Sequence, residues 1–446
     1  MLTFGFVKCQ VSKEADKLAP ELAKLKKMGI PTEPEELKPN PPVPDAQNAA
    51  LLYQKITEEN RKIGELVTKR ERDLISLNTG FAGDLAEYRA ALKKYQSSFA
   101  LIDQLTSRPR MDYKQDYSKG FPVEFEEFAA TKNVAKMLTA RSQFWIDSKQ
   151  YDRALKDVET QFVIANHLSE EVTLIGALVS IAINAIADAS LDRLLYAIQN
   201  NQPMLAKTEA MLLRRQKVPN IRRCFYGEMV LGRVSIKSVD SWRFFDPSGS
   251  NPAEPTGIEK GWDRMTVGDP GVKRMFEARA VAMWRELFEK FPKDDLDWQG
   301  FQKAFKDVET KINADQSLPN KINQVLFPVF DQAAMAFAKL AATQRTALLS
   351  VKLLRARATG LPKDLSKYGN LAIDPMDGKP MRYLHRGKGF KVWSIGQDLI
   401  DQGGKRRVPG ASGQDYDIVK GFDIGLPAPV SKPVSTSGRN GFAGGP

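Results

Sequence analysis

Cysteine and histidine are scarce in this chain, whose 446 residues include two of each. Two cysteines, Cys9 and Cys224, allow at most one disulfide and exclude a cysteine-rich metal site. We expect both thiols to be free, because Cys9 lies close to the N-terminus, where chains are commonly mobile. Two histidines, His167 and His385, argue against a multi-histidine metal site and against a histidine-centred catalytic triad.

Short catalytic motifs are missing as well. The sequence contains no P-loop, no GxGxxG turn after a strand, no GxSxG elbow and no HExxH pair. Acidic clusters such as Asp294, Asp295 and Asp297 are typical of solvated surface, although paired carboxylates can divide acid and base roles in a cleft. The sequence therefore favours a protein that is not an enzyme. The alternative is a hydrolase-type enzyme with a carboxylate-based site under the irregular segment 240–271.

Hydrophobic runs long enough to cross a bilayer are also lacking. The most apolar run, residues 172–187, stops at Asp188 and contains Ser180 and Asn184, whereas a span needs about 20 apolar residues. We therefore predict no transmembrane segment. Because apolar residues occur on all sides of this run, we expect a helix enclosed by others. The first residues have neither a basic region nor an adequate apolar stretch, so no signal peptide is complete in the sequence as given.

Charge is unbalanced towards basic residues, with 66 Lys and Arg against 54 Asp and Glu and a formal net charge of +12. The basic residues are densest in segments 207–243, 339–367 and 379–407. A solvated basic face is the favoured interpretation. The alternative is a binder of nucleic acid or another anionic polymer through these patches.

Helical periodicity dominates what is present. Apolar residues recur at spacings of three and four along 85–105, which predicts one helix ended by Pro109. Residues 133–168 predict a helical hairpin with its turn at 147–150, and Tyr151 with Ala154 resembles a tetratricopeptide-type unit. Segments 151–160 and 301–310 are similar, which suggests a duplicated helical unit. We predict a mainly α fold of antiparallel, irregular, tetratricopeptide-like hairpins with a small C-terminal β-hairpin module.

Domain boundaries are expected at proline- and glycine-rich stretches. The predicted parts are an N-terminal helix with a Pro-rich connector (1–44), a helical domain (45–239), a long irregular strap carrying Trp242 and Trp262 (240–271), a second helical block packed on the first (272–360), a β-module (361–425) and a flexible tail (426–446). In the β-module, residues 381–385 and 390–395 alternate as strands around the turn 387–389, which predicts a hairpin packed on a helix over 330–359.

The C-terminal pattern carries a family resemblance. A helix is followed by Asp374-Pro375, then Gly378-Lys379-Pro380, Trp393-Ser394-Ile395-Gly396, an acidic loop and Gly403-Gly404. This order resembles the C-terminal β-module of type II secretion major pseudopilins over about residues 330–419. Together with the Pro-Pro-Val-Pro-Asp45 entry to the first long helix, it is also similar to a group of uncharacterised, mostly helical, usually exported bacterial proteins.

The resemblance implies properties of the module and of the compartment. In pseudopilins the acidic loop binds a structural Ca²⁺, and the matching carboxylates here are Asp398, Asp401 and Asp417, with Asp415 adjacent. The alternative is a solvated turn capped by its own aspartates. The secretion role does not transfer, because pseudopilins carry their long helix at the N-terminus.

The function predicted from the sequence is a non-enzymatic helical scaffold or protein-interaction protein. The likeness to exported proteins implies a periplasmic or cell-envelope location. A protein partner is expected, and its identity does not follow from the sequence.

Overall fold

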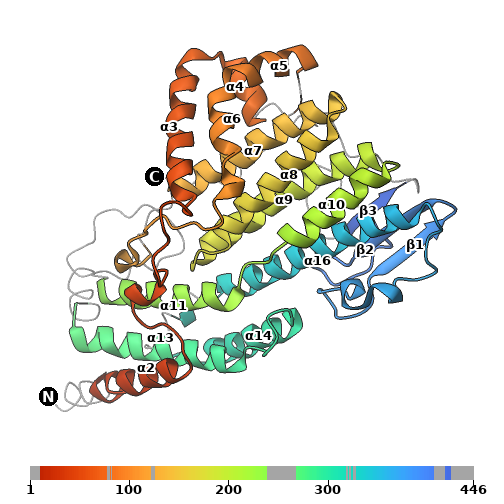
Figure 1. Cartoon of the computed structure of the whole chain (residues 1–446). Coiled ribbons are helices and arrows are strands. Elements are labelled where there is room, and N and C mark those ends of the chain that lie inside the picture. Colours follow the sequence, from red (N-terminus) through yellow and green to blue (C-terminus); the bar gives the residue numbers. More distant parts are fainter. Residues whose placement is uncertain are drawn as a thin grey trace.

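The computed structural model describes residues 11–77, 81, 83–121, 126–238, 268–317, 320, 323–324, 328–405 and 417–422. Within them, helices form the body and a three-stranded antiparallel sheet lies at one end (Figure 1). The predicted mainly α fold with a small β-module is therefore confirmed. The tail 426–446 and most of the predicted strap, residues 240–267, lie outside the described residues.

The described helices follow one another as α2 (Leu18–Lys27), α3 (Ala50–Leu66), α4 (Lys69–Ser76), α5 (Leu85–Lys94), α6 (Gln96–Ile102), α7 (Glu126–Asp147), α8 (Tyr151–Leu168), α9 (Leu174–Ile198), α10 (Gln202–Arg215), α11 (Ile221–Ser238), α13 (Pro270–Lys290), α14 (Trp298–Ala314) and α16 (Pro328–Ala356). Short 3₁₀ helices cover Pro34–Leu37, Leu105–Ser107, Tyr117–Lys119 and Ser366–Ala372. The strands are β1 (Arg382–Arg386), β2 (Gly389–Ser394) and β3 (Ile418–Phe422).

The predicted hairpin 133–168 is present as α7 and α8, joined by a turn in which Lys149 has a positive φ of 57°. Ala154 is fully buried where the two helices meet, and Ser142 Oγ lies 3.5 Å from its carbonyl oxygen. The prediction of a single helix over 85–105 is wrong. The chain breaks at Tyr95 into α5 and α6, because Tyr95 leaves helical dihedral angles (φ −90°, ψ 13°) while its side chain stays buried.

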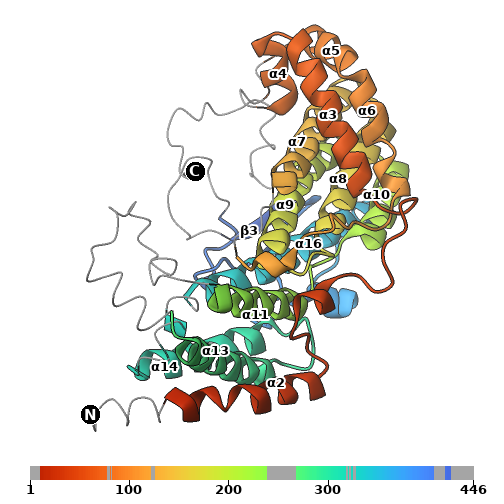
Figure 2. The same cartoon turned by 90° about the vertical axis from the view of Figure 1, so that its left-hand side faces the viewer.

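Helix α9 lies at the centre of the body, packed against α7, α8, α10, α11 and α16. The Thr173 side chain caps the N-terminus of α9 by accepting a hydrogen bond from Gly176 N (3.2 Å). Within the helix, Ser180 Oγ donates to the Ala165 carbonyl of α8 (2.7 Å). These bonds satisfy the polar groups of an apolar helix inside a protein core. Figure 2 shows α9 beside α7 and α8 in the upper group of helices, above α11 and α13.

The prediction that α9 is enclosed on every side is wrong for its first turns. Ile175 and Leu178 are 45% and 37% exposed, because an open cavity lies beside them between α9 and α11. Among the described helices, α9 alone has the length and composition to cross a membrane, and half of its most apolar stretch is buried in the fold. A core helix passes the same test, and the neighbours of α9 are consistent with that interpretation.

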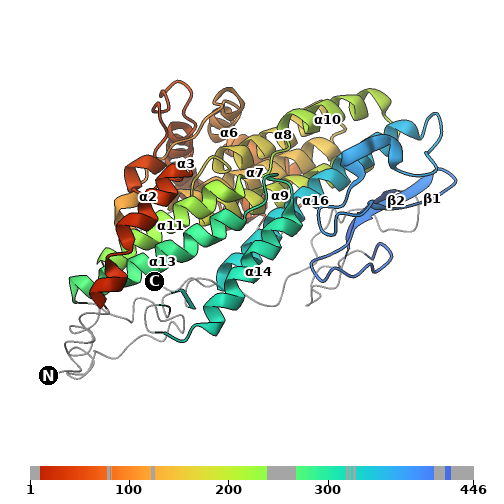
Figure 3. The same cartoon turned by 90° about the horizontal axis from the view of Figure 1, so that it is seen from below.

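Three apolar cores divide the body. The first joins α2, α11, α13, α14 and the start of α16, the second joins α3 to α8, and the third joins α8, α9, α10, the end of α16 and the sheet. Helix α16 therefore contributes to two cores, with Phe337 and Ala341 in the first and Leu349 and Leu353 in the third. Figure 3 shows α16 running from the side of α14 to the sheet.

The predicted β-hairpin is confirmed and gains a third strand. β1 and β2 pair antiparallel across the turn at Gly387, which has a φ of 58°, and β2 pairs antiparallel with β3. Phe390 and Val392 are fully buried against the C-terminal half of α16. A hairpin alone is marginal in water, so this apolar contact with α16 stabilises the module.

One buried lysine ties the sheet to the body. Lys420 on β3 is 4% exposed, and its ammonium reaches Asp188 (2.9 Å) and Asp192 of α9. These carboxylates keep the pKa of Lys420 above its ordinary value although burial lowers it. The module is therefore held by α16 on one side and by α9 through charge on the other.

Candidate functional site

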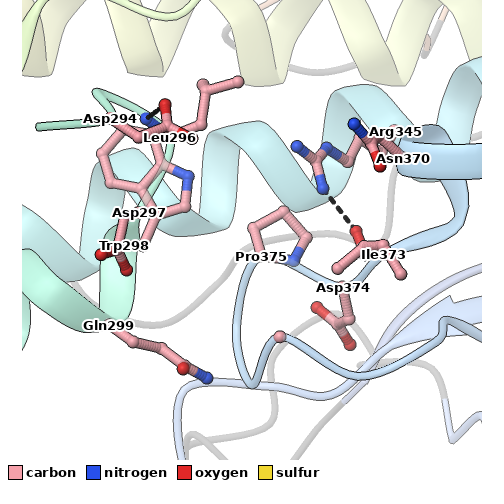
Figure 4. A pocket seen from close by; sticks show the side chains of 11 residues that line it. Asp294, Leu296, Asp297, Trp298, Gln299, Arg345, Asn370, Ile373, Asp374 and Pro375 are labelled. Atoms are coloured by element: carbon pink, nitrogen blue, oxygen red, sulfur yellow. Dashed lines mark hydrogen bonds between the residues drawn. The ribbon is translucent and has the colours of Figure 1, made fainter.

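A cleft of about 320 Å³ lies where the helical body meets the β-module. Its walls come from the start of α14, from α16 and from the loop that enters the sheet (Figure 4). The lining residues are Asp294, Leu296, Asp297, Trp298, Gln299, Arg345, Asn370, Ile373, Asp374, Pro375 and Gly378. Segments more than 70 positions apart in the chain thus share one site, since Trp298 and Asp374 face the same space.

Asp374 organises the module side of the cleft. It is fully buried and accepts hydrogen bonds from Ser394 Oγ (2.7 Å), Met376 N (2.9 Å), Ile395 N (3.1 Å) and Arg382 Nη1 (2.7 Å). Burial raises the pKa of Asp374 above its ordinary value, and these donors oppose that shift. Because four donors occupy its two oxygens, Asp374 is a structural group that fixes the loop against β2.

Trp298 forms the floor on the helical side. Its side chain is 3% exposed and packs on Phe301 and Phe337, with ring centroids 6.0 and 6.2 Å apart. The indole nitrogen Nε1 has no hydrogen-bond partner within the described part of the chain. Figure 4 shows this nitrogen on the side of the ring that faces Pro375 and Arg345. A buried N–H donor therefore points into the cleft without an acceptor.

Arg345 of α16 supplies the second donor group. Its Nη1 donates to the Ile373 carbonyl (2.5 Å), which holds the guanidinium at the cleft wall. Partial burial lowers the pKa of Arg345, while the carboxylates of Asp374 and Asp294 oppose that effect. In the residues described here it forms no ion pair within 4 Å, so most of its N–H groups are available to a ligand.

The remaining carboxylates stand at the entrance to the cleft. Asp297 caps α14 by accepting from Gly300 N (2.8 Å), and Asp294 accepts from Leu296 N (2.8 Å). Both residues are exposed. Gln299 lies across from Gly378, whose added Cβ would stand 3.4 Å from the Gln299 amide. Asp294 and Asp297 of the acidic cluster are therefore turn and helix caps at the mouth of this cleft, whereas Asp295 pairs with Arg222.

The predicted calcium loop belongs to the same module, and Arg382, which bonds to Asp374, also lies 3.7 Å from Asp401. Asp401 accepts from Trp393 Nε1 (2.9 Å) and Gly403 N (2.8 Å), and Asp417 accepts from Gly404 N (2.8 Å). Asp398 and Asp417 both contact Gln402, the first through its side-chain amide and the second through its backbone N–H (3.4 Å). Asp415 lies outside the described residues. Asp398, Asp401 and Asp417 thus each accept a hydrogen bond from the segment 402–404.

The acceptor atoms of this loop suit a hard cation, but backbone N–H groups already occupy several of them. Lys391 also places its ammonium 2.5 Å from the Gly403 carbonyl, above the Trp393 ring. Among the described residues, no three His, Cys, Asp or Glu side chains are grouped in a way that could hold a metal ion. The calcium site therefore stays a prediction.

A more apolar cavity of about 420 Å³ lies beside the exposed turns of α9. It is lined by Phe121, Thr173, Leu174, Ile175, Leu178, Glu228 and Leu231. Burial raises the pKa of Glu228 to about 7, although the Leu174 N–H that donates to it (2.7 Å) lowers that pKa. Glu171, which accepts from the Tyr117 hydroxyl (3.1 Å), also has its pKa raised by burial to about 7.

The two histidines take part in neither cavity. His167 is 1% exposed, lies between the Tyr53 hydroxyl (2.9 Å) and the Arg108 carbonyl (2.6 Å), and burial lowers its pKa to about 4. His385 is exposed on β1, where it stacks on Tyr383. Cys224 is a free, buried thiol, and Cys9 lies outside the described residues.

Sequence reasoning identified the Asp374 turn and the Asp294–Asp297 cluster but missed Trp298 and Arg345 as members of one site. The available signal was Asp297 as a helix cap directly before an aromatic residue. That signal places Trp298 at the start of a helix and says nothing about the facing element.

Comparisons with protein families, with curated proteins and with solved structures found no match for this chain.

Proposed function

We propose that the protein is a non-enzymatic helical scaffold of the cell envelope that binds a protein partner at the cleft between α14, α16 and the β-module. The observation that carries the proposal is a pair of donor groups in a cleft whose buried carboxylate is already satisfied: Trp298 Nε1 has no acceptor among the described residues, and Arg345 uses one N–H on the Ile373 carbonyl. The exposed carboxylates of this cleft, Asp294 and Asp297, serve as turn and helix caps, which favours binding over catalysis.

The rigid attachment of the β-module supports a scaffold role. Lys420 and the apolar face of β2 hold the sheet on α9 and α16, and the hydrogen bonds of Asp374 fix the loop wall of the cleft against β2. Supporting contacts of this kind preserve the geometry of a binding site. The envelope location and the relationship of the module to pseudopilins rest on the sequence resemblance alone, and we retain both as part of the proposal.

The alternative of a nucleic-acid binder is less favoured because many of its cations are paired. Lys207 pairs with Asp152 (2.6 Å), Arg214 with Glu159 (2.7 Å) and Lys352 with Glu209 (2.5 Å). Cations held by carboxylates release fewer counterions when a phosphate approaches. The alternative of a carboxylate enzyme depends on the segment 240–267, which lies outside the described residues.

Site-specific photo-crosslinking in cells that produce the chain tests the proposal. A photo-reactive amino acid is placed at position 296, where Leu296 is 52% exposed at the cleft mouth. The matched control is position 213, where Leu213 is 62% exposed on α10. We expect an adduct of defined mass with an envelope protein from position 296 only.

Equal adducts from both positions, or none from position 296, would overturn the partner site. Fractionation of the same cells checks the compartment, and recovery of the chain only with soluble cytoplasmic proteins would contradict the envelope location.

A further inference from the structure

We infer that the cleft binds a carboxylate group, held between the indole N–H of Trp298 and the guanidinium of Arg345. This inference rests on the proposed function for the identity of the partner as a protein, and it adds the chemical group that the partner presents. Either a chain-terminal carboxylate or an Asp or Glu side chain offers this group.

Trp298 gives the first argument. A buried N–H that loses water without gaining an acceptor costs about 1–3 kcal/mol, so such groups usually have a partner. The Trp298 indole is 3% exposed, has no acceptor among the described residues and lines the cavity wall. An acceptor atom of a ligand in the cleft would satisfy this donor.

Arg345 gives the second argument. A guanidinium presents its N–H groups in a planar fork that matches the two oxygens of a carboxylate. The bond from Nη1 to the Ile373 carbonyl (2.5 Å) restrains the side chain before any ligand arrives. Restraint of this kind lowers the entropy cost of binding.

The charges around the cleft indicate whether a singly or a doubly charged anion fits it better. The start of α14, with Asp297 as its cap and Trp298 as its first residue, favours a negative group through the helix dipole. Asp294, Asp297 and Asp374 line the same cavity and disfavour a second negative charge. A singly charged carboxylate fits this balance better than a phosphate dianion. A volume of about 320 Å³ also suits the end of a peptide.

The signal of the Trp298 indole N–H in nuclear magnetic resonance spectra tests the inference directly. The full-length protein is labelled with ¹⁵N-tryptophan, and the Trp298 signal is assigned from Trp298→Phe. The probes are N-acetylglycine, its neutral amide N-acetylglycinamide, the α-amide of N-acetylglutamate as a side-chain carboxylate, and inorganic phosphate. Trp393, whose Nε1 already donates to Asp401, provides an internal reference signal.

We expect a saturable downfield shift of the Trp298 indole proton with one or both carboxylates and none with the amide. The stronger carboxylate identifies the source, and Arg345→Gln should weaken its binding at least tenfold, about 1.4 kcal/mol. Lys303→Gln, which removes an exposed cation of α14 outside the cleft lining, is the folded control and should bind as the unaltered protein does. If Arg345→Gln does not fold, the probe series on the unaltered protein decides the result.

An unchanged Trp298 signal with both carboxylates would overturn the inference, and so would an equal response to the amide or a stronger response to phosphate. These outcomes are independent of the crosslinking result. A partner can be captured at position 296 without a carboxylate contact, and a carboxylate can bind when no partner is captured.

Discussion

Arg141 and Arg233 are buried beside carboxylates, whereas the buried Glu171 and the partly buried Glu228 contact no charged partner among the described residues. Arg141 lies 2.6 Å from Asp157, and Arg233 lies 2.8 Å from Glu277. A buried charge with no counter-charge shifts its pKa towards the neutral form. Glu171 and Glu228 follow this rule, with pKa values raised to about 7.

Replacing Glu228 with glutamine should stabilise the protein in a pH-dependent way. The folded state holds the Glu228 proton more tightly than the unfolded chain, where the pKa is 4.5, so its contribution to the free energy of unfolding falls as pH rises from about 4.5 to about 7. Glu228→Gln should therefore raise that free energy by roughly 1–3 kcal/mol near pH 8 and by less near pH 5.

Urea unfolding of both proteins across this pH range measures the difference. The two proteins must be compared at each pH because His167, whose pKa is lowered to about 4, makes both of them more stable as pH rises from about 4 to 6.5. Subtracting one free energy of unfolding from the other removes this shared effect. A constant difference at all pH values would contradict the raised pKa of Glu228.

Gly227 of α11 lies close to the backbone of Val172, just before α9. A Cβ atom at this position would stand 1.8 Å from the Val172 carbonyl oxygen, a distance that only movement of the backbone can relieve. Gly227→Ala should destabilise the fold by roughly 1–3 kcal/mol or more. Gly64→Ala is the matched control, because nothing lies within 4 Å of its added Cβ in α3.

Thermal melting distinguishes the two glycine variants. The control should gain roughly 0.5–1 kcal/mol from lost chain entropy in the unfolded state. Destabilisation of similar size in both variants would show that helix propensity, and not the contact with Val172, decides the outcome.

At the scale of elements, the sheet depends on two helices that differ in how they hold it. α16 covers Phe390 and Val392 of β2, whereas α9 presents Asp188 and Asp192 to Lys420 of β3. Apolar contact supplies most of the stabilisation, while a buried ion pair is costly mainly when one member is removed. A substitution that breaks the ion pair is therefore the more specific test of how the sheet is held.

Lys420→Met should loosen the module by removing the buried ammonium group that contacts Asp188 and Asp192 of α9. We expect a loss of about 3–5 kcal/mol in the stability of β2 and β3, measured by hydrogen exchange of their amides relative to those of α7 and α8. Lys207→Met removes an exposed pair with Asp152 and should change stability by less than about 1 kcal/mol. Equal effects would mean that Lys420 is solvated.

Calcium should stabilise the acidic loop if the predicted site exists. The melting temperature is expected to rise with the logarithm of free calcium, because an ion that binds only the folded state shifts the unfolding equilibrium. Asp401→Asn should reduce this calcium-dependent rise, and Asp364→Asn, an exposed module residue outside the loop, should not. The same melting temperature in chelator and in millimolar calcium would show that the loop is a turn capped by its aspartates.

At the scale of the whole molecule, one side of α9 belongs to the core and the other side to the surface. Leu191→Ala removes a fully buried side chain and should cost about 2–5 kcal/mol, whereas Leu178→Ala, at a position 37% exposed, should cost less than about 1 kcal/mol. Urea unfolding of purified protein without detergent measures both. Comparable costs would contradict the assignment of the Leu178 side to the surface.

Periodicity predicted the helices and the hairpin because each depends on residues close in sequence. Ala154 and the turn before Tyr151 were enough to place α7 against α8. The break at Tyr95 and the exposed side of α9 were missed, because both depend on which distant helix packs alongside. The cleft could not be predicted for the same reason: Trp298, Arg345 and Asp374 come together only when α14, α16 and the module are assembled.

The length of α16 is as constrained as its composition. Its first half places Ala334 and Phe337 in one core and its second half places Leu349 and Leu353 in another, with one continuous helix between them. An α-helix turns about 100° per residue, so a single inserted or deleted residue near position 344 would rotate one set of side chains out of its core. Relatives of this protein should therefore vary in length in the turns at 357–364 and keep the register of α16 unchanged.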